Sequence, residues 1–343
     1  AWGTNRMNTP LPSWLDFFSI PASWLYGVIV RIRNRYYDRS KNVHSVSRPV
    51  IAVGNLTVGG TGKTPLVTWI VRCLREHGHN PAIVMRGYAS VDPANADEAV
   101  EYRQRLDNID VIVGADRVAT VNAYIDGGGE ADCFVMDDGF QHRRIARDLD
   151  IVVMDFLRDA FLERMLPAGW LREPVEGLRR SDAVVVSHAQ RSDPESLTVI
   201  EQVAGDPPIA WTSHHWSGLE MHDETGASKQ SLDWLTGKSL AVRLGIGHPG
   251  PVIEALVRLG AKVAIQLHAG DHQPFSTEEI TELETTSSSV DAIVMTLKDW
   301  VKARDVIQLS AMHCPIVVPT LELEVVEGTK ALETKLLSVF KLR

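Results

Sequence analysis

From residue 49 onward, short apolar runs alternate with longer amphipathic stretches, and this alternation limits the chain to a small group of folds. An apolar run of about five residues suits a strand that is buried on both faces, and an amphipathic stretch between two such runs suits a crossover helix. The pattern therefore predicts an α/β fold with a parallel sheet. The runs expected to form buried strands are 49–53, 82–85, 110–113, 132–136, 150–154 and 182–186, and residues 63–77 are expected to form a helix.

The periodicity weakens between residues 188 and 238, where polar residues, Pro and Gly accumulate, so we expect a domain junction there. Further strands of a second α/β unit are expected at 239–247, 261–267 and 291–295, with helices at 250–259 and 328–340. The predicted division is an N-terminal segment 7–45, a large domain 46–213, a linker 214–238 and a smaller α/β domain 239–343.

The composition is that of a globular protein of 343 residues, with 44% hydrophobic and 23% charged residues. The 35 basic and 44 acidic residues give a net charge of -9, which argues against nucleic acid as a partner. Cys73, Cys133 and Cys314 lie far apart without a CxxC pair, so neither a disulfide framework nor a zinc site is indicated. A reducing, cytoplasmic setting is expected, and no segment implies an obligate protein partner.

The N-terminal segment contains an apolar run from Leu11 to Val30, followed by arginines. Pro12, Asp16 and Pro21 interrupt this run, whereas a spanning helix needs about 20 mostly apolar residues. Two interpretations remain. The segment is either an amphipathic helix at a membrane surface, with its arginines on anionic lipid, or a helix packed on the domain core. The residues expected in the headgroup region under the first interpretation are Trp14, Phe17, Phe18, Trp24 and Leu25.

Residues 54–64, GNLTVGGTGKT, follow a predicted strand and open a predicted helix, which is the context of a phosphate-binding loop. Glycines let backbone N–H groups face the phosphates, and the helix N-terminus adds its dipole. Lys63 is expected to reach the β- and γ-phosphates of ATP, and the Thr64 hydroxyl to bind Mg²⁺. Thr57 replaces the first glycine of the usual GxxxxGK[ST] pattern. The predicted nucleotide-binding residues are Gly59, Gly60, Thr61, Gly62, Lys63 and Thr64.

Two aspartates follow the predicted strand 132–136. A carboxylate at the end of a strand beside the phosphate loop is where P-loop folds hold Mg²⁺. We predict Asp138 as the metal ligand and Asp137 as a neighbour with a structural or water-mediated role. The alternative is a solvated Asp-Asp-Gly turn without a metal.

Three further segments, 166–174, 247–251 and 269–275, combine Pro and Gly with charged or histidine residues. A His beside an Asp at the end of a strand can orient a base or titrate near neutral pH, although a lone His is more often structural. The charged and histidine residues in these segments are Arg172, Glu173, His248, Asp271 and His272. His188, His214 and His215 are interpreted as surface or packing residues.

Taken in chain order, these segments resemble the lipid A 4'-kinase family over almost the whole sequence. The matching pieces are VGNLTVGGTGKTP (53–65), RGY (86–88), DE (97–98), GADR (114–117), DDGFQHRR (137–144), LPAG-LREP (166–174), GIGHP (245–249), DHQPF (271–275) and LKDWVK (297–302). The combination of GNLTVGGTGKTP with DDGFQH is specific, because other P-loop families do not carry both.

This resemblance implies a P-loop kinase with two α/β domains that transfers the γ-phosphate of ATP to the 4'-hydroxyl of a tetraacylated glucosamine disaccharide 1-phosphate. It also implies a peripheral protein at the cytoplasmic face of the bacterial inner membrane. Asp97 is then the acceptor of the hydroxyl proton, His272 orients it or tunes its pKa, and Asp138 binds Mg²⁺. Other matched positions, expected to contact substrate or to support the site, are Arg86, Asp137, Gln141, His142, Arg172, Glu173, Asp271, Lys298 and Asp299.

The sequence departs from the family pattern in several places. MRGYA, ADEA and TLKD stand where the family usually reads SRGYG, GDEP and TTEKD. The connection 89–96 before Asp97 is shorter than usual, and the loss of Gly and Pro there changes the backbone preferences of the loop. Trp170 and His248 replace a usual Pro and Asn, at positions that bear on acyl-chain or sugar preference.

Two other classes of protein remain open from the sequence. A P-loop switch or partitioning ATPase would also use a GGTGKT loop and a membrane helix, but it commonly carries a Lys just before the glycines, where this chain has Val58. A P-loop kinase of another amphipathic alcohol is the second class. Stimulation of ATP hydrolysis by candidate acceptors would separate these classes.

Overall fold

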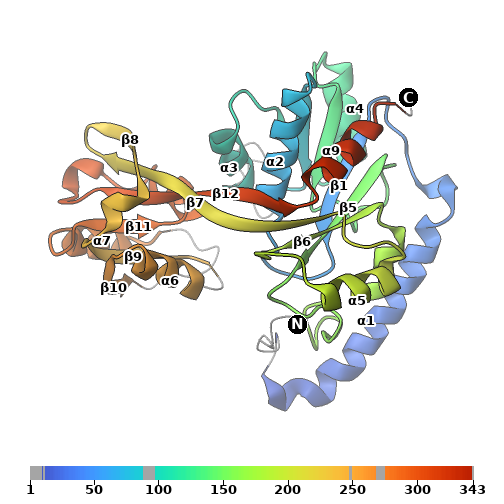
Figure 1. Cartoon of the computed structure of the whole chain (residues 1–343), viewed down its shortest axis with the longest axis horizontal. Coiled ribbons are helices and arrows are strands. Elements are labelled where there is room, and N and C mark those ends of the chain that lie inside the picture. Colours follow the sequence, from blue (N-terminus) through green and yellow to red (C-terminus); the bar gives the residue numbers. More distant parts are fainter. Residues whose placement is uncertain (1–9, 11, 88–96, 247–248, 268–274, 342–343) are drawn as a thin grey trace. The chain divides into compact units, whose positions relative to one another are not determined.

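A computed structural model describes residues 10, 12–87, 97–246, 249–267 and 275–341. The chain forms two compact units (Figure 1). Unit 1 comprises Ala1–His214 and Leu323–Arg343, and unit 2 comprises His215–Glu322. Both units are built from mostly parallel strands with helices, so the predicted α/β class is confirmed.

The sheet of unit 1 has the order β7-β6-β5-β1-β4-β2-β3, and its neighbouring strands run parallel. Because β1 is central, the loop that follows it emerges between the carboxyl ends of β4 and β5, where α/β sheets usually bind ligands. The strands are β1 (Val50–Asn55), β2 (Pro81–Met85), β3 (Val111–Val113), β4 (Cys133–Asp137), β5 (Leu149–Asp155), β6 (Ala183–Ser187) and β7 (Ala210–Asp223).

Both faces of this sheet are buried, which explains why its strands are continuous apolar runs. Along β1, Ile51 and Val53 pack in one hydrophobic cluster with Leu66 of a covering helix, while Val50 and Ala52 belong to a cluster on the other face. The helices of this part of unit 1 are α2 (Lys63–Glu76), α3 (Asp97–Arg105), α4 (Arg117–Asp126) and α5 (Pro194–Ala204), with a 3-10 segment η4 (Val175–Arg180).

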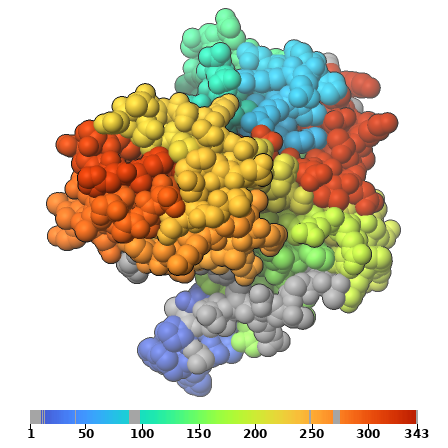
Figure 2. Space-filling view, turned by 60° about the vertical axis from the view of Figure 1, so that its left-hand side comes forward, coloured from blue at the N-terminus to red at the C-terminus, as the bar shows by residue number. Residues whose placement is uncertain are grey.

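The predicted domain boundaries differ from the structural division. Residues 214–238, expected as a linker, contain most of the strand β7, the strand β8 (Gly226–Gln230) and the 3-10 turn η5 (Leu232–Leu235). The chain then returns to unit 1 along β12 (Ile316–Glu327) and ends in α9 (Thr329–Ser338). Figure 2 shows the red C-terminal segment beside the light-blue α2, and the buried Leu332 and Leu336 of α9 join the core cluster of α2.

Unit 2 has its own parallel strands in the order β10-β9-β11-β12, and β8 pairs with β7 in the antiparallel direction. A capping box formed by Ser276 and Glu279 explains where one of its helices begins. The remaining elements are β9 (Ser239–Arg243), β10 (Lys262–Leu267), β11 (Ala292–Met295), α6 (Gly250–Arg258), α7 (Thr277–Ser287), α8 (Leu297–Ala303) and η6 (Leu309–Ala311).

The N-terminal segment forms the turn η1 (Ser13–Leu15), the helix α1 (Asp16–Tyr37) and the turn η2 (Ser40–Asn42). One face of α1 packs on the rest of unit 1, where Ser23 donates a 2.8 Å hydrogen bond to the carbonyl oxygen of Met165 and Tyr26 donates one of 3.0 Å to that of Arg172. No helix in the described ranges is long and apolar enough to cross a membrane. The exposed large apolar residues of η1 and α1 are Trp14, Phe17, Phe18, Ile20, Trp24, Leu25, Ile29, Ile32 and Tyr36.

Candidate active site at the carboxyl end of the unit 1 sheet

The Gly-rich loop 54–64 connects β1 to α2. Gly62 precedes α2 with φ 80°, a left-handed conformation that favours glycine, and a Cβ there would lie 2.7 Å from Cε1 of His214. Ser187, the last residue of β6, donates a 2.8 Å hydrogen bond from Oγ to the carbonyl oxygen of Thr61. The loop is therefore fixed against the ends of the neighbouring strands.

Lys63, the first residue of α2, is oriented by two partners. Its Nζ donates a 3.1 Å hydrogen bond to Oδ1 of Asn55 and lies 3.5 Å from Oδ1 of Asp138. Asn55 is fixed in turn, because its Nδ2 donates a 2.7 Å bond to the carbonyl oxygen of Thr57. A phosphate that enters the loop would meet an ammonium group that is already in place.

The two aspartates at the end of β4 are fixed from several sides. Asp138 has φ 48°, a conformation that is uncommon for a residue other than Gly and that recurs at functional sites. Arg172 donates from NH1 to both carboxylate oxygens of Asp138, at 2.9 and 2.8 Å. Arg117 donates to the backbone carbonyl oxygens of Asp137 and Asp138, at 2.9 and 3.1 Å. The turn therefore holds the Asp138 carboxylate between Lys63 and Arg172.

Charge is distributed unevenly over the carboxylates of this site. Burial raises the pKa of Asp137, although Lys63 opposes the rise. Burial also acts against ionisation of Asp138, but Lys63 and Arg172 outweigh it and hold the pKa of that carboxyl below its usual range. The pKa of Glu98 in α3 is raised to about 7 by desolvation and by the negative charges of Asp137 and Asp138. Asp138 is therefore ionised at neutral pH beside two carboxyls that repel further negative charge.

The residues at this site fit Mg²⁺. Mg²⁺ prefers hard oxygen ligands and commonly combines one or two carboxylates with substrate phosphates and water. Asp137, Asp138 and Glu98 supply such oxygens, and their mutual repulsion is what a divalent cation would relieve. Within the described ranges, no three His, Cys, Asp or Glu side chains are grouped so as to hold a metal by themselves.

Gln141 and Glu173 connect the loop 166–174 to the end of β1. Gln141 donates from Nε2 to the carbonyl oxygen of Asn55 and to Oε1 of Glu173, both at 2.7 Å. Glu173 is buried and accepts bonds from NH1 and NH2 of Arg180 at 2.7 and 2.8 Å. Asn34 of α1 donates a 3.3 Å bond to the same carboxylate. This network positions the neighbouring Arg172.

The other predicted site residues have different surroundings. Burial lowers the pKa of His142 to about 4, and the charge of Arg117 adds to this effect, so the imidazole is neutral at pH 7. Arg86 is exposed after β2, and Lys298 lies half-buried in α8 of unit 2. Asp97 begins α3, but its side chain, and the residues Asp271, His272 and His248 altogether, lie outside the described part of the chain.

Sequence reasoning assigned no site role to several residues that the structure places here. Asn55, Glu98 and Arg117 all lie within segments that match the family, but their roles depend on contacts between β1, α3, α4 and β4. Tyr102 is fully buried and donates a 2.9 Å hydrogen bond to Oδ2 of Asp137. Its i+4 spacing from Glu98 was a usable signal, because it places both side chains on one face of α3.

A central strand, a Gly-rich loop and a helix that begins with Lys63, next to a strand that ends in Asp138, together define a P-loop nucleotide-binding α/β protein. Comparison with known families narrows this class. The family described as tetraacyldisaccharide-1-P 4'-kinase matches residues 15–341, and the chain belongs to this family.

Individual relatives agree with this assignment. The tetraacyldisaccharide 4'-kinase of Chlorobaculum parvum is 34% identical over 96% of each chain, and that of Halorhodospira halophila is 37% identical over 84% of each. The crystal structure of LpxK from Aquifex aeolicus in complex with ATP has a TM-score of 0.69 at 24% identity, and covers 94% of this chain and 98% of its own. At that identity, the structural likeness supports the fold.

Proposed function

We propose that this chain transfers the γ-phosphate of ATP to the 4'-hydroxyl of a tetraacyldisaccharide 1-phosphate, which gives the bisphosphorylated lipid A precursor. Family membership supports the reaction, and the convergence of Lys63 and Arg172 on Asp138 beside the phosphate loop is the observation that carries the proposal. Phosphoryl transfer needs mainly positioning and neutralisation of charge, and these are what the site provides.

In this proposal the backbone of 59–62 cradles the phosphates, Lys63 approaches the β- and γ-phosphates, and Thr64 and Asp138 hold Mg²⁺. When bound, Mg²⁺ neutralises the charge that develops on the transferred phosphoryl group. Arg172 keeps Asp138 in place and adds a second positive charge on the side facing the loop 166–174. Asp97 and His272 keep the proton-transfer roles that the family resemblance implies.

For location, we propose that α1 lies on the cytoplasmic face of the inner membrane, which would bring the site to its lipid acceptor. The helix is attached to unit 1 by Ser23 and Tyr26 and exposes aromatic residues on the rest of its surface. Trp14, Phe17 and Trp24 are 75%, 81% and 72% exposed. Aromatic side chains followed by arginines are typical of helices in the membrane interface.

The test is transfer of phosphate from ATP labelled at the γ-position to tetraacyldisaccharide 1-phosphate in detergent micelles with Mg²⁺, comparing wild type with Lys63→Ala. Loss of this charged group should lower the rate about 10³-fold or more. Thr198→Ala, a change on the exposed side of α5, is a control that should retain wild-type transfer. ATP hydrolysis by the wild type without labelled lipid would contradict the proposal and favour a switch ATPase.

A further inference from the structure

A positively charged cavity of about 470 Å³ lies where the C-terminal half of α1 meets unit 1. We call it the arginine cavity, because it is lined by Arg31 and Arg35 of α1, Arg143 after β4, and Arg179 and Arg180 of η4. Asp38 and Glu176 are the acidic residues in its wall. Even with Glu173, which pairs with Arg180, five guanidinium groups meet three carboxylates, and this excess of positive charge favours an anionic occupant.

Part of this wall is rigid. Arg143 donates to the carbonyl oxygen of Asn34 at 2.9 Å and to Oδ1 of Asp38 at 2.8 Å, so it is held against α1. Arg180 is held by Glu173 and stacks on the ring of Phe140 at 3.6 Å. Arg31 and Arg35 are exposed and form no ion pair within the described residues. The cavity thus combines two arginines that are held by partners with two exposed donors on the helix.

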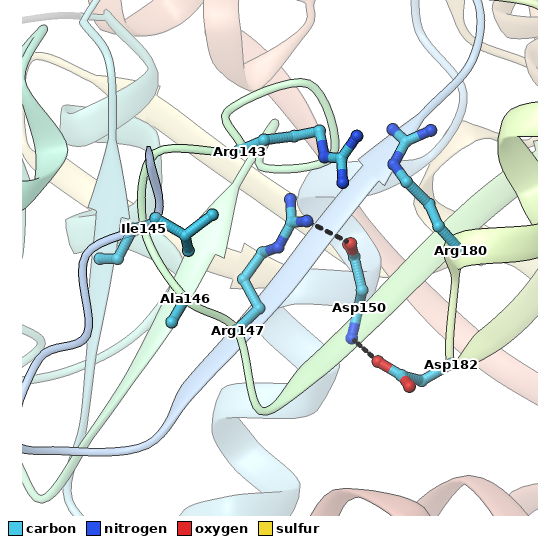
Figure 3. A pocket seen from close by; sticks show the side chains of 8 residues that line it. Arg143, Ile145, Ala146, Arg147, Asp150, Arg180 and Asp182 are labelled. Atoms are coloured by element: carbon cyan, nitrogen blue, oxygen red, sulfur yellow. Dashed lines mark hydrogen bonds and ion pairs between the residues drawn. The ribbon is translucent and has the colours of Figure 1, made fainter. Parts of the chain in front are cut away.

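An adjoining cavity of about 250 Å³ shares Arg143 and Arg180 and contains Arg147 (Figure 3). Here the charges are nearly balanced, because Arg147 lies 3.1 Å from the buried Asp150, whose N–H donates to Asp182 at 2.8 Å. Figure 3 shows the guanidinium groups of Arg143, Arg147 and Arg180 directed toward one another. The excess of positive charge therefore lies in the outer, arginine cavity.

The face of α1 that carries Arg31 and Arg35 continues as an apolar stripe. At about 100° per residue, positions 17, 20, 24, 31 and 35 fall within about 60° of one another on the helix surface. Phe17, Ile20 and Trp24 on this face are 81%, 44% and 72% exposed. The stripe from Arg31 to Phe17 is about 21 Å long, at about 1.5 Å per residue. One helix face therefore joins the positively charged cavity to a surface suited to acyl chains.

We propose that the arginine cavity binds the headgroup phosphate of an anionic membrane phospholipid, whose acyl chains lie along the apolar stripe of α1. This inference rests on the proposed placement of α1 at the membrane and adds selectivity for one class of lipid. Arginine forms bidentate bonds with phosphate, and several arginines from separate segments select a net negative headgroup over a zwitterionic one.

The experiment is co-sedimentation of the full chain with vesicles of phosphatidylcholine alone or with a minority of phosphatidylglycerol, at about 0.15 M salt to screen long-range attraction. Wild type should bind the anionic vesicles more tightly. Arg31→Gln/Arg35→Gln should lower that affinity about 30-fold, since one basic residue at an anionic surface is worth about 5-fold. Binding to neutral vesicles should change less than about 2-fold.

Arg39→Gln/Lys41→Gln is the matched control, because it removes two charges from the same basic segment, outside the cavity. Diffuse attraction predicts similar losses for both double variants, and that result would overturn the proposal. A loss confined to Arg31→Gln/Arg35→Gln supports a site.

A second arm tests whether the cavity instead holds the phosphate of the kinase's own acceptor. In neutral detergent micelles without phospholipid, Arg31→Gln/Arg35→Gln should leave the KM for tetraacyldisaccharide 1-phosphate unchanged. A rise in KM there would overturn the phospholipid assignment. Phe17→Ala/Trp24→Ala tests the membrane placement of α1 separately from the phospholipid site. Unchanged binding of this variant to both kinds of vesicle would count against the membrane role of α1, whatever the arginine variants do.

Discussion

The two units each contain an arginine–aspartate ion pair, and the two pairs differ in how open they are. Arg172 and Asp138 of unit 1 approach to 2.8 Å, and Arg243 and Asp299 of unit 2 approach to 2.7 Å. The first two side chains are 24% and 19% exposed, whereas the other two are each 2% exposed. Nearly equal distances therefore occur in a pair at a candidate active site and in a pair sealed inside the protein.

The closed pair in unit 2 makes several further bonds within the unit. Asp299 accepts further bonds from the N–H of Gly245 at 3.0 Å and from the hydroxyl of Thr296 at 2.7 Å. Arg243 also pairs with Glu279 at 3.1 Å and lies 3.8 Å from the ring centroid of Phe275. Such a network fixes β9 to α7 and α8, and both carboxylate oxygens of Asp299 accept bonds from within the unit.

The charges around the open pair in unit 1 are less completely compensated. Asp138 faces Arg172 and Lys63 while Asp137 and Glu98 add negative charge, so its partners can be exchanged when phosphate and a cation enter. The comparison shows that an arginine–aspartate pair alone does not indicate function. Partial exposure and incomplete compensation of charge are the distinguishing features.

Among the substitutions that distinguish the two ion pairs, Asp138→Asn should have the largest effect on phosphate transfer. We expect phosphate transfer to fall about 10³-fold, or about 4 kcal/mol in activation free energy, because the site loses its ionised oxygen ligand. The unfolding free energy should change by less than about 1 kcal/mol, because the side chain is partly open to solvent. Initial rates and denaturant unfolding on the same preparation measure both. If Asp138→Asn instead unfolds easily, the Arg172–Asp138 pair has a structural role like that of the Arg243–Asp299 pair.

Asp299→Asn should show the reverse pattern. Removing the charge leaves the buried Arg243 with Glu279 as its one charged partner among the described residues, so we expect a loss of about 3 kcal/mol in the stability of unit 2. Hydrogen exchange of the β9 and β11 amides measures it. The control is Asp305→Asn, whose side chain is 79% exposed beside Arg304 and should cost no more than about 0.5 kcal/mol. Equal costs for the two variants would remove the distinction between closed and surface pairs.

Arg172→Lys tests geometry at constant charge. Lysine keeps the charge, but its flexible chain and compact ammonium do not hold a nitrogen as firmly between the two oxygens of Asp138, so we expect transfer to fall about 10²-fold, or about 2.7 kcal/mol, with little change in stability. The matched change Arg243→Lys should instead lower stability and leave the rate per folded molecule near that of the wild type. Full activity of Arg172→Lys would mean that only the charge of this residue matters.

The sequence was informative where a local pattern determines the structure. Residues 50–55 and the Gly-rich loop could be placed because a buried strand, left-handed glycines and a helix start are all encoded within a short stretch. The strand β7 was missed, because its 14 residues alternate irregularly between buried and half-buried and carry polar side chains. The return of β12 and α9 to unit 1 is a long-range pairing that no local pattern reports.

The two ion pairs show the same limit at the level of sites. The family motif drew attention to Lys298 as well as to Asp299, but the buried Asp299 has its partner Arg243 at the end of a strand 56 positions earlier. Burial of an arginine depends on tertiary contacts, whereas the residue type alone predicts that an arginine is exposed at the surface. The relation of Arg172 to Asp138 likewise joins residues 34 positions apart.

The smallest expected effect is a pH dependence that belongs to the open site. The folded-state pKa of Glu98 is about 7, raised from 4.5 by desolvation and by Asp137 and Asp138, so the folded protein binds more protons than the unfolded chain between these two values. Stability without Mg²⁺ and nucleotide should therefore fall as pH rises from about 4.5 to about 7 and then level off. Because part of Glu98 is nevertheless open to solvent, screening should limit the decline to about 1 kcal/mol.

Glu98→Gln should remove this decline, since the amide does not ionise. Denaturant unfolding of wild type and variant across the pH window measures the difference. Mg²⁺ with a non-hydrolysable ATP analogue should reduce the wild-type slope, because the cation favours the ionised carboxylates. Identical slopes for wild type and Glu98→Gln would show that the repulsion among the three carboxylates is already relieved, and the open site would then be as well compensated as the Arg243–Asp299 pair.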